Sequence, residues 1–255
     1  IKWNSTLNFS FNRNKIVHLY GEMIDELDEE GNVIGQREAD DIGNGWFIGE
    51  SLDRIWDYEI LGIWQLSEEE EAAVYGKQPG DVKLKDQNDD GTLTPTDDKI
   101  FQGYRRPQYR IGFRNDLVFF KNFELSAFIR ADLGFYGANN LHRNSGSNSD
   151  FERRNRMYRP YWTKDNPIND YARLNSDTDS PGFTWWENRS FLRLQDVSLA
   201  YNVPKSKLTK LRIQKLKVFV NFRNLLTITG WEHYDPESGT TRMPKYSSIG
   251  INVSL

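Results

Sequence analysis

Residues 86–97 carry the sharpest chemical signal in the chain. Their sequence, DQNDDGTLTPTD, fits the calcium-loop pattern, with oxygen-bearing side chains at positions 1, 3 and 5 and Gly at position 6. Ca²⁺ takes roughly six to eight oxygen ligands at flexible distances, and alternate residues of a tight loop supply such ligands. The predicted ligands are Asp86, Asn88, Asp90, Thr92 through its backbone carbonyl, and Asp97.

The ion in this loop is expected to have a structural role. Asp97 stands where such loops usually carry a bidentate Glu, so we expect a modest affinity. Mg²⁺ is the alternative ion, although it demands stricter octahedral geometry. No helical pattern flanks the loop, because Pro79-Gly80 precedes it and Gln102-Gly103 follows it. We therefore expect a loop-stapling ion rather than a calcium sensor; the alternative is a solvated turn that binds nothing.

A second candidate site is aromatic. Tyr161, Trp162, Trp185 and Trp186 fall in one long polar stretch of the chain. Arginines accompany them at positions 143, 153, 154, 156 and 159. Aromatic faces and guanidinium groups suit sugar or peptide ligands and protein interfaces. The alternative is that these side chains pack against one another within the loop.

The remaining sequence offers little support for catalysis. Cysteine is absent, which excludes disulfides, thiolate metal sites and a Cys nucleophile. The three histidines are scattered, and no nucleophile-elbow, P-loop or dinucleotide-binding pattern occurs. A net charge of −4 gives no basic footprint for nucleic acid. We therefore expect neither an enzyme nor a nucleic-acid partner.

The elements that must position these sites are strands, because apolar and polar residues alternate with a period of two. The alternating segments run about ten residues, which is the length that a tilted membrane strand needs. Strands in soluble domains are shorter, about five or six residues. The predicted strands are 3–13, 15–24, 43–50, 54–65, 108–120, 123–133, 190–203, 214–226 and 246–255.

Hydropathy is compatible with a membrane barrel. The mean hydropathy is −0.73, and no apolar run approaches the roughly 20 residues of a membrane helix. A barrel strand shows lipid only at every second residue, so a low mean hydropathy does not exclude it. Apolar alternating residues such as Ile129 are expected to face lipid, and neighbours such as Ser126 to face inward.

The connections are predicted to alternate between short and long, as in outer-membrane barrels. Counting back from the last strand puts the long stretches outside the cell: Asp25 to Asn44, Leu66 to Pro107, Gly134 to Arg189 and Thr227 to Lys245. The same count puts the short turns in the periplasm: Arg13-Asn14, Ser51-Leu52-Asp53, Lys121-Asn122 and Pro204 to Arg212.

The order of these features resembles the SusC/RagA family of TonB-dependent outer-membrane transporters of Bacteroidetes. The matching stretches are 49–52, 57–65, 79–91, 107–113, 121–126, 190–201 with 203–204, 224–227, 234–237 and the closing strand. The resemblance spans essentially the whole chain but only the C-terminal part of the family. Leu255 departs from the usual final Phe, and Asn202 stands where the family often has Thr.

This resemblance implies an all-β fold, with residues 1–255 forming the C-terminal strands of one large antiparallel transmembrane β-barrel. The family barrel has about 22 strands and a plugged lumen. The remaining N-terminal part of the same protein, with its plug and TonB box, is then a required partner. We read the chain, which begins at Ile1, as a mature segment of such a protein.

The implied function is energised import of oligosaccharides or peptides through the outer membrane. A SusD-like lipoprotein would cover the barrel, and TonB would act through the missing part. The external loops, above all 134–189 and 227–245, would meet substrate or this lid, with Tyr161, Trp162, Trp185 and Trp186 as the expected contacts. The stretch 66–107 would be the extracellular loop that holds the calcium-type loop. Two alternatives remain: a secreted, calcium-stabilised glycan-binding β-protein, and a surface glycosidase.

Overall fold

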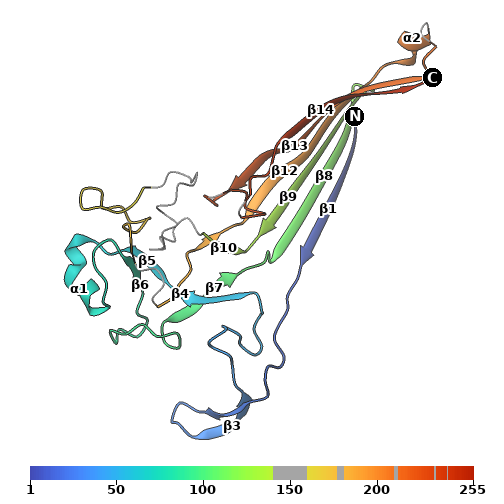
Figure 1. Ribbon diagram of the computed structural model, residues 1–255. Coiled ribbons are helices and arrows are strands. Elements are labelled where there is room, and N and C mark those ends of the chain that lie inside the picture. The colour runs from blue at the N-terminus through green and yellow to red at the C-terminus, as the bar shows by residue number, and fades with distance from the viewer. Residues whose placement is uncertain (140–159, 177–180, 210–211, 233, 240) are drawn as a thin grey trace. The chain divides into compact units, whose positions relative to one another are not determined.

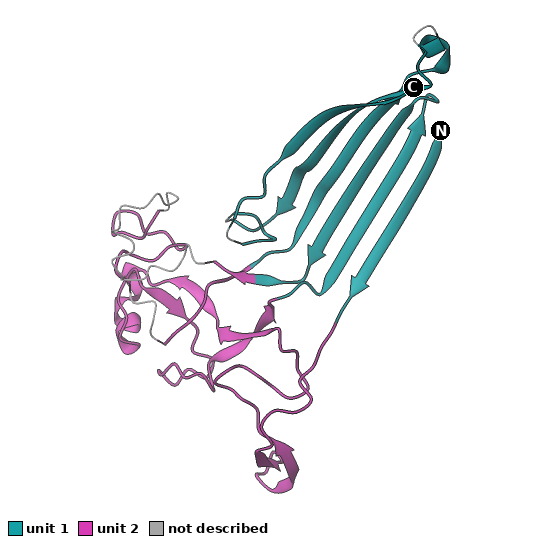
Figure 2. Ribbon diagram, turned by 45° about the vertical axis from the view of Figure 1, so that its right-hand side comes forward, with its two compact units in different colours: residues 1–12, 106–136, 188–255 teal, residues 13–105, 137–187 magenta. Residues whose placement is uncertain are grey.

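The computed structural model describes residues 1–139, 160–176, 181–209, 212–232, 234–239 and 241–255. Its regular structure is nearly all β, and the strands pair antiparallel, as expected. The chain forms two compact units, teal and magenta in Figure 2. Unit 1 comprises residues 1–12, 106–136 and 188–255, and unit 2 comprises residues 13–105 and 137–187.

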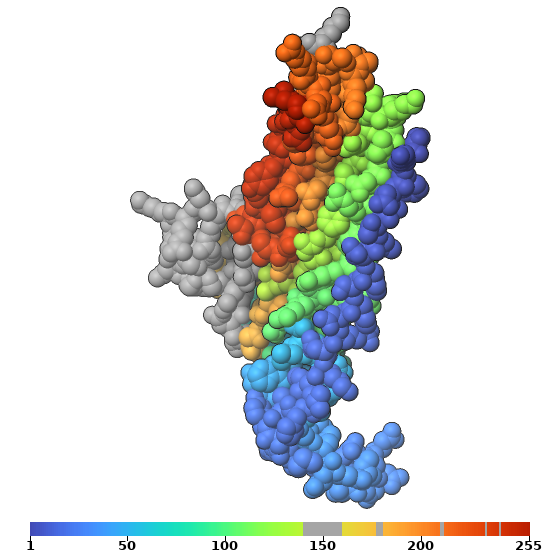
Figure 3. All heavy atoms as spheres, turned by 90° about the vertical axis from the view of Figure 1, so that its right-hand side faces the viewer, coloured from blue at the N-terminus to red at the C-terminus, as the bar shows by residue number. Residues whose placement is uncertain are grey.

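Unit 1 is a six-stranded sheet with the order β1-β8-β9-β12-β13-β14 (Figure 1). Six of the nine predicted strands are thereby confirmed, and the chain's two ends lie at the same end of this sheet. In the space-filling view the strands lie side by side from β1 in blue to β14 in red (Figure 3). The bounds are β1 (Lys2–Phe11), β8 (Tyr109–Phe119), β9 (Phe123–Leu133), β12 (Phe191–Asn202), β13 (Lys215–Thr229) and β14 (Tyr246–Ser254).

One face of this sheet is apolar. Leu7 is opposite Phe113, Phe113 is opposite Ile129, and Ile129 is opposite Leu194, so the alternation within each strand continues across the sheet. Many side chains of this face are exposed, including Leu7 at 66%, Phe9 at 63% and Ile249 at 81%. Soluble monomers rarely expose an apolar patch that runs across a whole sheet. We therefore infer that this face contacts an apolar environment.

The opposite face is polar. One row of directly opposed residues crosses all six strands and contains no apolar side chain: Asn4, Asp116, Ser126, Ser198, Asn221 and Ser248. The adjacent row carries Arg114 opposite Thr6, and Asp196 opposite Arg223. The sheet therefore separates an apolar surface from a hydrogen-bonding one.

Two predicted strands are wrong. Residues 15–22 form no strand, because Gly21 has a φ of +80° and the Glu38 carboxylate accepts the backbone N–H groups of Leu19 and Gly21. The chain then enters a separate hairpin of β2 (Met23–Leu27) and β3 (Val33–Glu38). Residues 43–50 hold turns and isolated bridges only.

The predicted strand 54–65 is broken into two short strands. β4 (Arg54–Tyr58) pairs with β7 (Lys99–Tyr104), and β5 (Ile60–Ile63) pairs with β6 (Val82–Leu84). Both pairs belong to unit 2 rather than to the long-stranded sheet.

The predicted short turns at Arg13-Asn14 and Ser51-Leu52-Asp53 are also wrong. Phe11 at the end of β1 lies opposite Tyr109, at the end of the sheet farthest from the β8–β9 turn at 120–122. Residues 12–108 are therefore one long connection. It leaves the sheet at the same end as the connections 134–190 and 230–245, whereas 120–122 and 203–214, which contains α2 (Lys205–Leu208), lie at the other end.

Unit 2 is built from short elements around its own core. The core consists of Tyr58, Ile63, Val82, Leu84, Trp162 and Ala172. The helix α1 (Glu69–Val74) buries Ala72, and the short strands β10 (Tyr136–Ala138) and β11 (Trp186–Asn188) pair with each other. Among the described residues, no helix is both long and apolar enough to cross a membrane.

The β13–β14 pairing depends on a glycine. A Cβ added to Gly250 would overlap Cζ of the opposed Phe219, so the ring would have to move. We expect Gly250→Ala to lower the free energy of unfolding by about 1–3 kcal/mol, the usual cost of overpacking. Thermal unfolding of the complete protein measures this change. Ser248→Ala, two residues earlier on the same face, is the control, and equal unfolding temperatures for the two variants would contradict the prediction.

Candidate functional site

An arginine–carboxylate cluster occupies the polar face of the sheet, formed by Arg130, Arg193, Asp132, Asp235 and Glu237. Arg193 of β12 is 2% exposed, and its guanidinium donates to both Asp235 and Glu237. Arg130 of β9 donates to Asp132 at 2.7 Å and to Glu237 at 2.8 Å. Two strands thus hold two carboxylates of the β13–β14 connection.

A third arginine anchors the same connection through its backbone. Arg189 donates to the carbonyl oxygens of Pro236 and Glu237, and its guanidinium lies 5.2 Å from the ring centre of Trp231. Because three arginines converge on residues 235–237, this segment is fixed against the polar face. This cluster was not predicted from the sequence. The available signal was the arginines at 130 and 193 on the polar side of predicted strands, whose charge requires a partner when buried.

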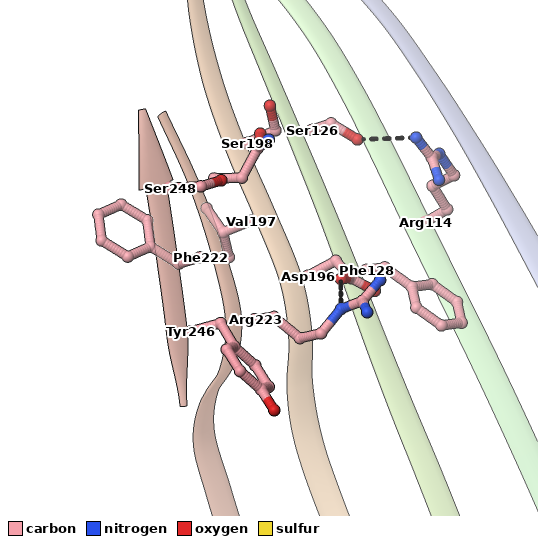
Figure 4. A pocket seen from close by; sticks show the side chains of 11 residues that line it. Arg114, Ser126, Phe128, Asp196, Val197, Ser198, Phe222, Arg223, Tyr246 and Ser248 are labelled. Atoms are coloured by element: carbon pink, nitrogen blue, oxygen red, sulfur yellow. Dashed lines mark hydrogen bonds and ion pairs between the residues drawn. The ribbon is translucent and has the colours of Figure 1, made fainter. Parts of the chain in front are cut away.

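Beside this cluster the polar face is hollowed. The hollow is lined by residues of β8, β9, β12, β13 and β14, including Arg114, Ser126, Ser198, Tyr246 and Ser248. Figure 4 shows Arg114 donating to Ser126 and Arg223 paired with Asp196 across the strands. Hydroxyl, guanidinium and phenol groups together can recognise a polar ligand through hydrogen bonds.

The four predicted aromatic contacts lie in different environments within unit 2. Trp162 is 5% exposed in the core, where its indole N–H donates to Gln65. Trp185 packs against the same core, and the Trp186 indole N–H donates to Asp57 at 2.8 Å. Only Tyr161 of the four is exposed. Trp162, Trp185 and Trp186 therefore make packing contacts or hydrogen bonds within unit 2. The arginines at 143, 153, 154, 156 and 159 lie outside the described residues.

The loop at 86–97 is folded by its own side chains. The Asp86 carboxylate accepts the backbone N–H of Gly91 at 2.8 Å and the Tyr75 hydroxyl at 3.1 Å. The amide of Asn88 donates to Asp90 at 3.0 Å, and Asp90 accepts the backbone N–H of Thr92. Positions 1 and 6 of the loop are therefore in contact, as are positions 3 and 5.

The end of the loop is closed by two neighbouring carboxylates with different roles. Asp97 is exposed and accepts the Thr94 hydroxyl at 2.8 Å. Asp98 is fully buried, and its two oxygens accept the backbone N–H groups of Gln87 and Thr94. The described residues contain no cluster of three or more His, Cys, Asp or Glu side chains that could hold a metal ion.

The charge of Asp86 is favoured in this setting. Burial alone would raise the pKa of its carboxyl group, but the backbone N–H of Gly91 and the Tyr75 hydroxyl outweigh burial and hold the pKa below its usual range. Asp86 is therefore an anion at neutral pH although its residue is only 7% exposed.

Comparison with known proteins finds relatives that are named TonB-dependent receptors. No family model matches it. TonB-dependent receptor P26 of Formosa agariphila is 30% identical, in an alignment that covers 99% of this chain and 27% of the relative. TonB-dependent receptor P3 of the same organism is 29% identical, covering 92% of this chain and 23% of the relative. The chain thus spans about a quarter of the length of these relatives.

Solved structures show the same fold. A structure of the RagAB peptide transporter matches with a TM-score of 0.62 at 22% identity, covering 99% of this chain and 27% of that chain. The RagAB peptide importer in its open-open state matches with a TM-score of 0.60. The expected relationship and the antiparallel fold are confirmed. The relatives are receptors and transporters rather than enzymes, which agrees with the expectation of no catalytic activity.

The arginine–carboxylate cluster yields a stability prediction. We expect Arg193→Met to lower the free energy of unfolding by about 3–5 kcal/mol, because it removes one partner of a buried ion pair and leaves Asp235 uncompensated. Arg223→Met is the matched control: it breaks an exposed cross-strand pair with Asp196 and is expected to cost below about 1 kcal/mol. Denaturant or thermal unfolding of both variants tests the difference, and equal losses would mean that burial of Arg193 adds nothing.

Proposed function

We propose that this chain, a homologue of TonB-dependent receptors, forms C-terminal strands of an outer-membrane β-barrel transporter that imports oligosaccharides or peptides. The observation that carries the proposal is the sheet of unit 1. Its long strands expose an apolar face, and their other face is polar. A barrel wall needs this division, because one face meets lipid and the other lines the lumen.

The two edge strands of the sheet support the proposal that further β-strands pair with it. β1 and β14 are the end strands of the described order, so each offers its outer backbone groups to a further strand. Within lipid an open sheet edge is not tolerated, because unpaired N–H and C=O groups have no water to bind. The remaining N-terminal part of the same transporter would supply the strands that close the barrel.

The lengths of the connections indicate which end of the sheet faces the periplasm and which faces the outside of the cell. Under this proposal the short connections 120–122 and 203–214 lie in the periplasm, and the long connections 12–108, 134–190 and 230–245 lie outside the cell. The stretch 66–107 then belongs to an extracellular loop region, and residues 1–255 are one portion of a single barrel domain.

The proposed partners follow from the solved relatives and from the polar face. The RagAB structures carry the name of a peptide importer, which favours a peptide, and an oligosaccharide is the other candidate. A SusD-like surface lipoprotein would cover the extracellular side, where exposed Tyr161 is a candidate contact. TonB would supply energy through the N-terminal part. The alternative of a secreted glycan-binding β-protein fits the polar face but leaves the exposed apolar face without an environment.

Uptake by cells tests the proposed function. A strain lacking the complete gene should lose growth on short peptides or on oligosaccharides as the sole source of carbon, and the plasmid-borne gene should restore it. The protein extracted in detergent should bring a surface lipoprotein with it. Recovery of the complete protein as a folded, monodisperse species from the aqueous fraction would contradict the membrane location.

The lipid-facing assignment gives a paired mutational prediction. We expect Ile129→Arg, on the apolar face of β9, to cost about 2–4 kcal/mol, because a charge near the middle of the bilayer is strongly disfavoured. Ser198→Arg on the polar face of β12, opposite the uncharged Ser126 and Asn221, should cost much less. Folding of the complete barrel into lipid vesicles measures both costs. Equal costs would contradict the assignment of faces, and a larger cost for Ser198→Arg would reverse it.

A further inference from the structure

One oxygen of Asp86 lacks a partner. The Oδ2 atom accepts from Gly91 and Tyr75, whereas Oδ1 is buried and has no hydrogen-bond partner among the described residues. The residue as a whole is 7% exposed, so water has little access to this oxygen. A buried carboxylate oxygen without a donor or a cation is costly, and native structures rarely leave one in that state.

The surroundings of this oxygen favour a cation over a proton donor. Asp86 is the first position of a loop whose third and fifth positions are in contact, because the Asn88 side-chain amide donates to the Asp90 carboxylate. Gly91 has a φ of +80° and Asp89 a φ of +58°, and these conformations turn the loop back towards Asp86. The same loop therefore contributes the buried Oδ1 atom of Asp86 and further side chains with oxygen atoms, Asn88 and Asp90.

We infer that residues 86–97 bind one Ca²⁺ ion, with the unpartnered oxygen of Asp86 as the buried ligand. The other ligands are Asn88, Asp90, the backbone carbonyl of Thr92 and Asp97. Asp97 joins them by exchanging the Thr94 hydroxyl for the ion. This inference goes beyond the transport function, since it depends only on the loop and its neighbours in unit 2.

Calcium suits this donor set better than magnesium. The set mixes carboxylate, amide and carbonyl oxygens. Ca²⁺ accepts irregular coordination by several protein oxygens, whereas Mg²⁺ requires near-octahedral geometry and retains several waters. The expected affinity rests on the extracellular location proposed above, for which it is about 10⁻⁴–10⁻³ M.

The ion would staple elements of unit 2 to one another. Asp86 follows β6 by two residues and binds Tyr75 just beyond α1, while Asp98 directly precedes β7 and holds the backbone of Gln87. Because Asp98 already uses both oxygens on backbone donors, it anchors the loop rather than the ion. Loss of the ion should therefore loosen residues 86–97 and leave the strands in place.

The test measures bound calcium in the complete transporter, purified in detergent. The protein is stripped with a chelator and dialysed against about 1 mM radioactive calcium. Asp86→Asn and Asp90→Asn should each hold one Ca²⁺ per chain fewer than the wild type, and protease should cut them faster within residues 86–97. Asp90 is exposed, so its substitution leaves folding intact even if Asp86→Asn does not.

Asp89→Asn is the matched control. It removes the same charge from the same loop, at a position that contributes no ligand and whose positive φ Asn tolerates. This variant should keep the wild-type calcium content. Equal calcium in all four proteins would overturn the site, and so would a loss in Asp86→Asn alone. Complete displacement of the ion by an equal concentration of Mg²⁺ would overturn the assignment to calcium.

Discussion

Backbone hydrogen bonding between neighbouring strands fixes the register of the unit 1 sheet, and the register decides which side chains share a face. With a side-chain period of two, a slip of one residue would exchange the apolar and polar faces of a strand. Within β12 the alternation of apolar and polar residues is interrupted once, at Leu194-Gln195-Asp196. A bulge in β12 absorbs this change, so that Leu194 stays on the apolar face and Asp196 on the polar one.

The polar face meets a second constraint, which is the neutralisation of charge. Charged side chains of this face form ion pairs within one strand, as Arg114 does with Asp116, and between strands, as Lys217 does with Glu124. Arg193 pairs instead with Asp235 of the β13–β14 connection. Pairing leaves a surface rich in donors and acceptors without one dominant sign of charge. Under the proposed function, such a lumen wall suits ligands recognised through many hydrogen bonds, which describes peptides and oligosaccharides alike.

The sequence predicts the long strands well because alternation over ten residues is a local signal. The prediction of a strand at 15–24 fails, because the backbone N–H of Leu19 donates to the carboxylate of Glu38, which lies about twenty residues further along the chain. The sequence also does not reveal that β1 pairs with β8, since no local pattern reports a partner so remote. For the loop at 86–97, spacing names the candidate ligands, but the burial of Asp98 and the unpartnered oxygen of Asp86 appear only in three dimensions.

The long connection between β1 and β8 has a consequence for the order of folding. The β8–β9 hairpin closes a loop of residues 120–122, whereas pairing β1 with β8 closes residues 12–108. Loop-closure entropy grows with the logarithm of loop length, so the second closure costs about 3 kcal/mol more. The β8–β9 hairpin is therefore expected to form first. β1 then pairs with β8 after residues 12–108 have become compact through the core of unit 2, which brings the ends of this connection closer together.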